Sequence, residues 1–218
     1  MADPNAKIQS FFLPGPAGRL EALLNAGTDV AKFAAVVAHP HPLFGGTMHN
    51  KVVYHAAKAL NGFGFPVLRF NFRGAGLSEG EHGHGKPEVE DVRAALEWMK
   101  EQFHLPLIFA GFSFGASTGL RASCSDPEVK YLISLGTPIA ADGRVYAYRL
   151  LADCNKPKLF VSGDHDQYGP LTELHRVFQS AADPKKLVVV PNADHFFEGQ
   201  LPIMRGAIES WLTEQLAA

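Results

Sequence analysis

The stretch Gly111–Gly115 reads Gly-Phe-Ser-Phe-Gly, the pattern G-x-S-x-G, and its neighbours decide the fold. Before it, Leu105–Ala110 is an apolar run typical of a buried parallel strand. After it, Ala116–Ala122 consists mainly of small residues and predicts a helix. A sharp turn between strand and helix exposes the Oγ of Ser113, and it needs flanking glycines because larger side chains would collide with the neighbouring strand and helix. The pattern therefore predicts a nucleophilic serine at a strand-turn-helix junction.

Strand-like and helix-like segments alternate along the whole chain. The opening, Lys7–Ala26, predicts two short strands around a Pro-Gly turn. Further strands are predicted at Phe33–Ala38, Pro66–Phe72, Leu105–Ala110, Val129–Leu135, Lys158–Ser162 and Lys186–Val190. Further helices are predicted at Asn50–Leu60, Val89–Phe103, Leu171–Ser180 and Ile203–Leu216. This alternation predicts an α/β protein with a mostly parallel sheet and helices on both of its faces.

The length of 218 residues predicts one domain, residues 1–218, with a substantial core. No repeat or interdomain linker is visible. The two longest loops, Gly74–Pro87 and Pro138–Pro157, are too short for a separate cap domain. The cysteines Cys124 and Cys154 lack the spacing of metal ligands, and we expect free thiols.

Charge and hydropathy exclude several classes of partner. A formal net charge of −2 gives no basic surface for nucleic acid and no polybasic patch for a membrane. No apolar run is long enough to span a membrane, and Met1–Lys7 lacks the pattern of a secretion signal. We therefore expect a cytoplasmic protein with a small-molecule partner. The sequence leaves a homodimer open, because one chain does not distinguish an exposed apolar patch from core.

Acidic and histidine residues follow two later strands. Asp164 and Asp166 come after the strand that ends at Ser162, and His195 comes after the last predicted strand. Because the carboxyl ends of parallel strands meet at one edge of a sheet, the order Ser…Asp…His indicates a catalytic triad. His195 would take the proton of Ser113, and a carboxylate would orient His195. Position alone allows either aspartate, and the other would be an ordinary turn or capping residue.

An oxyanion hole needs two N–H donors. The backbone N–H of Phe114, directly after the serine, is expected to be one of them. The other is expected from the segment His39–Gly46, His-Pro-His-Pro-Leu-Phe-Gly-Gly, in which the prolines have no N–H. Leu43 is the preferred donor, with His41 and Phe44 as alternatives.

The remaining histidines do not predict a metal site. His39 and His41 form an H-x-H pair, but no third and fourth ligand accompany them, and a role in stabilising the loop is favoured. His82 and His84, in the loop Gly74–Pro87, are expected to be solvated, with contact to the cleft as the alternative. No metal or cofactor is predicted.

These motifs resemble the lidless bacterial α/β-hydrolases close to the dienelactone hydrolases and small carboxylesterases. The resemblance extends from about Lys7 to the C-terminus and rests on three stretches, residues 39–51, 70–80 and 111–115. It implies an α/β-hydrolase fold without a cap domain. It favours a bracing role for Arg73, with contact to an anionic substrate as the alternative. It also favours Asp166 over Asp164, because the acid of such enzymes usually stands three residues beyond the glycine that ends its strand, here Gly163.

We therefore expect a serine hydrolase of the carboxylesterase type that cleaves short-chain esters through an acyl-enzyme. Dienelactone hydrolases use a cysteine nucleophile, whereas this chain has Ser113, which favours ordinary carboxylic esters. The same triad would serve a peptidase, a thioesterase or a lactonase, and a non-catalytic binding protein of this fold is a further alternative. Aromatic residues near the site predict an apolar acyl pocket, although at least half of them are expected to be core: Phe44, Phe112, Phe114, Phe196 and Phe197.

Overall fold

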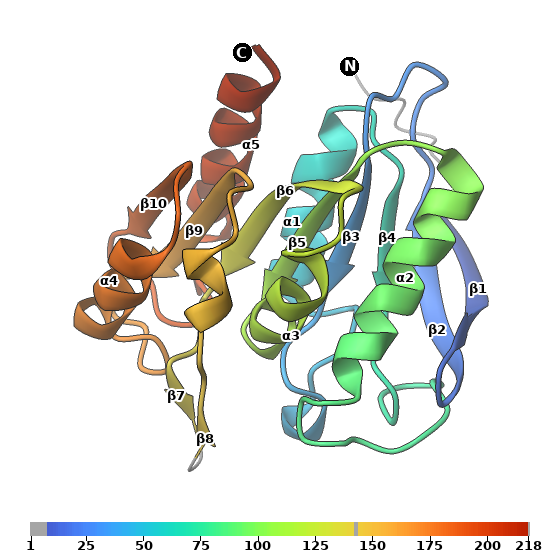
Figure 1. Cartoon of the computed structure of the whole chain (residues 1–218), viewed down its shortest axis with the longest axis horizontal. Coiled ribbons are helices and arrows are strands. Elements are labelled where there is room, and N and C mark those ends of the chain that lie inside the picture. The colour runs from blue at the N-terminus through green and yellow to red at the C-terminus, as the bar shows by residue number, and fades with distance from the viewer. Residues whose placement is uncertain (1–7, 142–143, 218) are drawn as a thin grey trace.

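The computed structural model of the chain describes residues 8–141 and 144–217. Within them, an eight-stranded sheet has helices on both faces (Figure 1). Its strands are β1 (Ile8–Gly15), β2 (Gly18–Asn25), β3 (Ala34–Ala38), β4 (Val67–Phe70), β5 (Leu107–Phe112), β6 (Val129–Leu135), β9 (Lys158–Gly163) and β10 (Lys185–Val190). The helices are α1 (Lys51–Gly62), α2 (Glu88–Phe103), α3 (Phe114–Ser123), α4 (Leu171–Ser180) and α5 (Leu201–Ala217).

The strand order across the sheet is β1-β2-β4-β3-β5-β6-β9-β10. The pairs β1/β2 and β2/β4 are antiparallel, and every other neighbouring pair is parallel. The predicted α/β class, a mostly parallel sheet between two helical layers, is confirmed. Strand boundaries shift by a few residues for a local reason: β5 begins after Pro106, because proline has no N–H for the sheet.

The two faces of the sheet carry separate apolar cores. In β5, Leu107 and Phe109 belong to the core covered by α2, α3 and α4, whereas Ile108 and Ala110 belong to the core covered by α1 and α5. Alternate residues of a strand point to opposite faces, so an uninterrupted apolar strand supplies both layers. Figure 1 shows α2, α3 and α4 in front of the sheet and α1 and α5 behind it.

Shorter elements that the sequence did not predict occur in the loops that follow β3 and β6. They are the 3-10 helix η1 (Pro42–Phe44), the two-stranded hairpin β7 (Ala140–Ala141) and β8 (Arg144–Val145), and the 3-10 helix η2 (Arg149–Ala152). In Figure 1 the hairpin projects at the lower end of the molecule. η2 packs on one face of the sheet, where Leu151 is buried in the core beside α4. The carboxyl ends of the parallel strands, η1 and the hairpin together form the edge on which the candidate residues lie.

Arg73 and the two cysteines have the surroundings that the sequence predicts. Arg73 donates to Asp91 on α2, with Nη2 2.6 Å from Oδ1, and this buried pair braces the loop after β4 as the resemblance implies. Both cysteines are free thiols. None of the helices in the described ranges has the length and apolar character needed to cross a membrane.

Candidate active site

Ser113 stands at the turn between β5 and α3 with φ 54° and ψ −119°, in the region that favours glycine. Its neighbours explain why the flanking residues are glycines. A Cβ on Gly111 would lie 2.6 Å from the backbone N of Ala116, and a Cβ on Gly115 would lie 2.5 Å from the carbonyl oxygen of His39. The strand and the helix therefore approach too closely for any side chain, as the G-x-S-x-G pattern predicts.

The structure brings Ser113, His195 and Asp166 into one hydrogen-bonded row. His195 Nε2 lies 2.9 Å from Ser113 Oγ, and His195 Nδ1 lies 2.9 Å from both carboxylate oxygens of Asp166. The His195 and Asp166 side chains are 3% and 0% exposed, so water competes little for these bonds. A serine hydroxyl in such a row can pass its proton to the imidazole and act as a nucleophile.

The two candidate aspartates have different surroundings. Asp166 Oδ1 accepts the backbone N–H groups of Tyr168 and Gly169, each at 2.9 Å, and these bonds fix the carboxylate beneath His195. Asp164 instead contacts the ring of His165 at 3.3 Å and is one-third exposed. Asp166, the residue favoured by the resemblance, is thus the aspartate in contact with His195, and Asp164 is a turn residue.

A cavity of about 200 Å³ opens beside Ser113 and His195. Its remaining lining residues are Pro40, His41, Phe44, Gly45, Gly46, Asn50, Arg144, Tyr146, Tyr168 and Phe196. Of the five aromatic residues expected here, Phe44 and Phe196 line the cavity, whereas Phe112, Phe114 and Phe197 are buried in the core. Arg144, Tyr146 and Tyr168 were not predicted. Only Tyr168, two residues after Asp166, carried a positional signal in the sequence.

The expected oxyanion donors lie beside the cavity rather than in its lining. Phe114 is the first residue of α3, so its N–H has no acceptor within the helix. The Leu43 N–H lies 3.2 Å from His41 Nδ1, and the Phe44 N–H donates to the His41 carbonyl at 3.1 Å. The Phe44 N–H is therefore already bonded within the loop and is not a donor for the oxyanion. Whether the Leu43 N–H is available depends on whether Nδ1 of His41 carries a proton.

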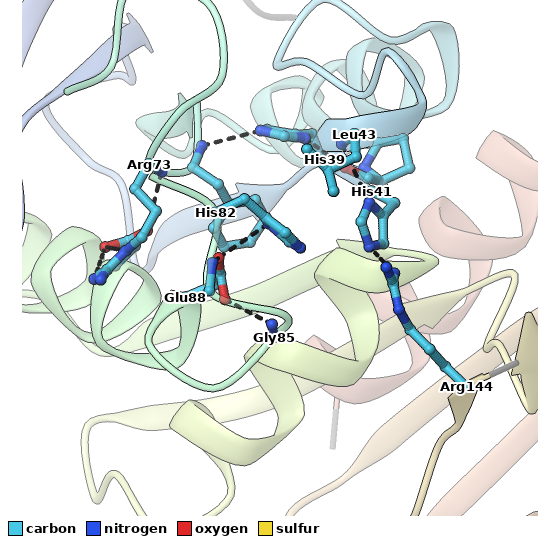
Figure 2. Close-up of polar contacts among 12 residues, drawn as sticks. His39, His41, Leu43, Arg73, His82, Gly85, Glu88 and Arg144 are labelled. Carbon is cyan, nitrogen blue, oxygen red and sulfur yellow. Dashed lines mark hydrogen bonds and ion pairs between the residues drawn. The ribbon is translucent and has the colours of Figure 1, made fainter. Parts of the chain in front are cut away.

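The ring of His41 lies 4.7 Å, centroid to centroid, from those of both His82 and Phe114, and the three rings form a cluster. Figure 2 shows His41 and His82 among the polar contacts of this region. The His82 side chain is only 5% exposed, with Nδ1 3.0 Å from Glu88 Oε1. The expectation that His82 is solvated is wrong. The buried Glu88 accepts the N–H groups of Gly83 and Gly85 and so folds the loop inward, while His84 stays exposed.

His39 is completely buried and stabilises the loop through both ring nitrogens. Its Nδ1–H donates to the Pro40 carbonyl at 2.6 Å, and its Nε2 accepts the Phe72 N–H at 3.0 Å. Since Nε2 is an acceptor here, the ring cannot be protonated without breaking a bond. Burial, as the largest cause, lowers the pKa of His39 to about 3.

This depressed pKa predicts acid sensitivity of the fold. Below pH ~6.5 His39 is protonated in the unfolded chain but not in the folded one. As the pH falls from there to the folded pKa of His39, this residue therefore lowers the free energy of unfolding by up to about 1.4 kcal/mol per pH unit. We expect His39→Gln to be less stable at pH 7 and to bind about one proton fewer on unfolding at pH ~5. Urea unfolding between pH 7 and 5 measures both. His175→Gln, an exposed change on α4, should keep the wild-type slope, and an unchanged slope in His39→Gln would refute the prediction.

No group of three or more His, Cys, Asp or Glu side chains able to hold a metal ion occurs among residues 8–141 and 144–217. The H-x-H pair is instead used in the loop: His39 bonds the backbone, and His41 contacts Leu43 and the guanidinium of Arg144.

Comparisons with known proteins identify the family and the fold. Residues 32–204 match the family described as alpha/beta hydrolase domain. An uncharacterized protein of Rickettsia prowazekii is 33% identical over 94% of this chain and 89% of its own length. An alpha-beta serine hydrolase homologue from Coxiella burnetii superposes with a TM-score of 0.86 at 35% identity, covering 94% of this chain and 97% of its own. An α/β serine hydrolase without lid from Xanthomonas campestris gives a TM-score of 0.85 at 35% identity over 100% and 99% of the two chains.

Proposed function

The chain belongs to the alpha/beta hydrolase domain family, and from this premise we propose that it is a serine hydrolase that cleaves short-chain carboxylic esters through an acyl-enzyme. The observation that carries the proposal is the hydrogen-bonded row from Asp166 through His195 to Ser113, which ends at the cavity. The two serine hydrolase relatives support the same chemistry, and the fold without a lid of the Xanthomonas campestris relative agrees with an open approach to the serine.

In the first step Ser113 Oγ attacks the ester carbonyl carbon while its proton passes to His195 Nε2. The distance of 2.9 Å between these two atoms suits this transfer. Asp166 holds Nδ1–H and stabilises the imidazolium that forms. The imidazolium then gives its proton to the alkoxide oxygen as that group leaves, and the acyl group remains on Ser113.

The developing oxyanion would be held by the N–H groups of Phe114 and Leu43. A neutral imidazole accepts only one hydrogen bond, yet both nitrogens of His41 face donors: Leu43 N–H at Nδ1 and the Arg144 guanidinium at Nε2. The charged donor forms the stronger bond and favours the lone pair on Nε2, with the proton on Nδ1. In this tautomer Nδ1 no longer accepts the Leu43 N–H, so the bond of 3.2 Å between them is given up and this N–H donates to the substrate oxyanion instead.

Deacylation repeats these steps with water. His195 takes a proton from a water molecule that attacks the acyl carbonyl, and it returns this proton to Ser113 Oγ as the carboxylic acid product leaves. Every proton transfer in both halves of the reaction thus passes through His195.

The size of the cavity favours small acyl groups. Its volume of about 200 Å³ is below the ~300–1,000 Å³ typical of pockets for drug-sized ligands. Phe44 and Phe196 supply apolar walls, with 64% and 46% of their surfaces exposed. A short acyl chain can lie against these rings, whereas a long one would extend into water without further contacts.

We predict that a fluorophosphonate probe labels Ser113 and that kcat/KM on p-nitrophenyl esters is highest between acetyl and butyryl and falls at least about tenfold by octanoyl, a loss of ~1.4 kcal/mol in transition-state binding. The labelled residue is identified by peptide mass spectrometry. Labelling without ester hydrolysis would move the substrate to a peptide, a thioester or a lactone. A folded protein that neither hydrolyses esters nor takes the label would refute the serine hydrolase and leave a binding protein.

A further inference from the structure

Arg144 places a positive charge in the wall of the cavity that holds Ser113. It lies on β8 of the short hairpin, and Figure 2 shows its side chain extending from that hairpin to the ring of His41. Among residues 8–141 and 144–217, none of those that line the cavity is acidic. No carboxylate among residues 8–141 and 144–217 forms an ion pair with Arg144.

The contact with His41 fixes the position of the Arg144 guanidinium and occupies only one of its N–H groups. Burial, as the main cause, together with the charge of Arg144 lowers the pKa of His41 to about 4, so the ring is neutral near pH 7. A neutral ring can accept one N–H from Arg144, and a guanidinium has five. The remaining N–H groups of Arg144 therefore lie at the cavity wall without an acidic partner in the described residues.

The other charged groups near His41 do not neutralise this charge. Glu88 is the acid that faces the ring cluster, but it is fully buried, and its two oxygens already accept the N–H groups of Gly83 and Gly85. His82 and His84, whose rings meet edge to face, are neutral or positively charged and supply no negative charge. Within the part of the chain that the structure describes, the cavity lining thus carries a positive charge and no negative one, which favours an anionic ligand.

We propose that the substrate is an ester with a carboxylate group and that Arg144 binds this carboxylate while Ser113 attacks the ester carbonyl. This inference rests on the proposed function and adds the charge of the substrate to it. The planar fork of arginine matches the two oxygens of a carboxylate, and His41 holds the fork at the cavity. A half-ester of a dicarboxylic acid is the simplest molecule with both groups.

The test compares two esters of nearly the same shape, the p-nitrophenyl monoester of glutaric acid and p-nitrophenyl 5-methylhexanoate, whose neutral isopropyl group replaces the carboxylate. For each enzyme we take the ratio of kcat/KM on the charged ester to that on the neutral ester, after subtracting the rate measured with Ser113→Ala. Arg144→Gln should lower this ratio at least about tenfold relative to wild type, chiefly through KM, as expected for the loss of a charge-assisted hydrogen bond. The wild-type ratio should also fall as salt is added.

The matched control is Arg149→Gln, which removes the same charge from an exposed position on η2 outside the cavity, and it should leave the ratio unchanged. The ratio is internal to each variant, so a change in the amount of folded protein does not affect it. Protection of Ser113 from the fluorophosphonate by glutarate, present in wild type and lost in Arg144→Gln, gives a readout without turnover.

An equal ratio in wild type and Arg144→Gln, with no protection by glutarate, would overturn the carboxylate site while neutral-ester hydrolysis left the proposed function standing. If neither ester were hydrolysed and Ser113 took no label, both proposals would fail.

Discussion

Ser113→Ala is expected to lower kcat on p-nitrophenyl acetate by about 10⁴- to 10⁶-fold, the largest effect of any single change in this chain. Ser113 Oγ is the hydroxyl that lies 2.9 Å from His195 Nε2, and alanine leaves the imidazole without a nucleophile to activate. A stopped assay at high enzyme concentration measures the residual rate. Retention of more than about 1% of the wild-type kcat would contradict the nucleophilic role.

We expect the backbone conformation that exposes the Ser113 hydroxyl to lower the free energy of unfolding. Ser113 has a backbone conformation, φ 54° and ψ −119°, that costs a residue with a side chain about 1–3 kcal/mol. Ser113→Ala keeps this strain and should unfold in urea like wild type. Ser113→Gly removes it and should be more stable by about 1 kcal/mol, although glycine is also more flexible when unfolded.

Ser10→Gly, in the extended backbone of β1, provides the matched control for this effect. There the serine conformation is unstrained, so glycine should lower stability by about 0.5–1 kcal/mol. Opposite signs at the two serines would identify strain as the cause. A loss of stability in Ser113→Gly would show that the turn is not strained.

Much of the fold could be predicted because it follows from short-range patterns. The row of Ser113, His195 and Asp166 could be predicted because each residue follows a predicted parallel strand. Apolar runs and amphipathic segments define most of the strands and helices, and the family comparison agrees that they form an α/β-hydrolase fold. The approach of His195 to Ser113 follows from a topological rule, since parallel strands end at one edge. Choosing Asp166 over Asp164 needed the resemblance, because both follow the same strand.

The wall of the cavity could not be predicted, because it depends on contacts between loops that are far apart in the sequence. Arg144 is on a strand of only two residues, too short for any periodicity, and it meets His41 about a hundred positions earlier. His82 is buried because Glu88 draws its loop inward, a contact that the glycine-rich sequence of that loop does not signal. Only the folded arrangement shows that Arg144 lies in the cavity wall and that no acidic side chain of the described residues lines this cavity.

Asp166→Asn is expected to lower kcat by about 10⁴-fold without disturbing the arrangement of the site. Asp166 Oδ1 accepts the N–H groups of Tyr168 and Gly169, so the amide oxygen of asparagine must take that place and its NH₂ group must face His195. Nδ1 of the imidazole then becomes the acceptor, and the proton moves to Nε2, where it faces Ser113 Oγ. In this tautomer His195 cannot take the proton of the serine.

Asp164→Asn is the matched control, with the same loss of charge two residues away on a side chain that is one-third exposed and does not contact His195. Its kcat should stay within about twofold of wild type, since surface changes outside the site have small effects. Fluorophosphonate labelling should slow in parallel with kcat for Asp166→Asn, because the label also needs an activated Ser113. If Asp164→Asn lost the larger share of activity, the carboxylate that the geometry places under His195 would not be the one that orients it, and the proposed proton path would have to be abandoned.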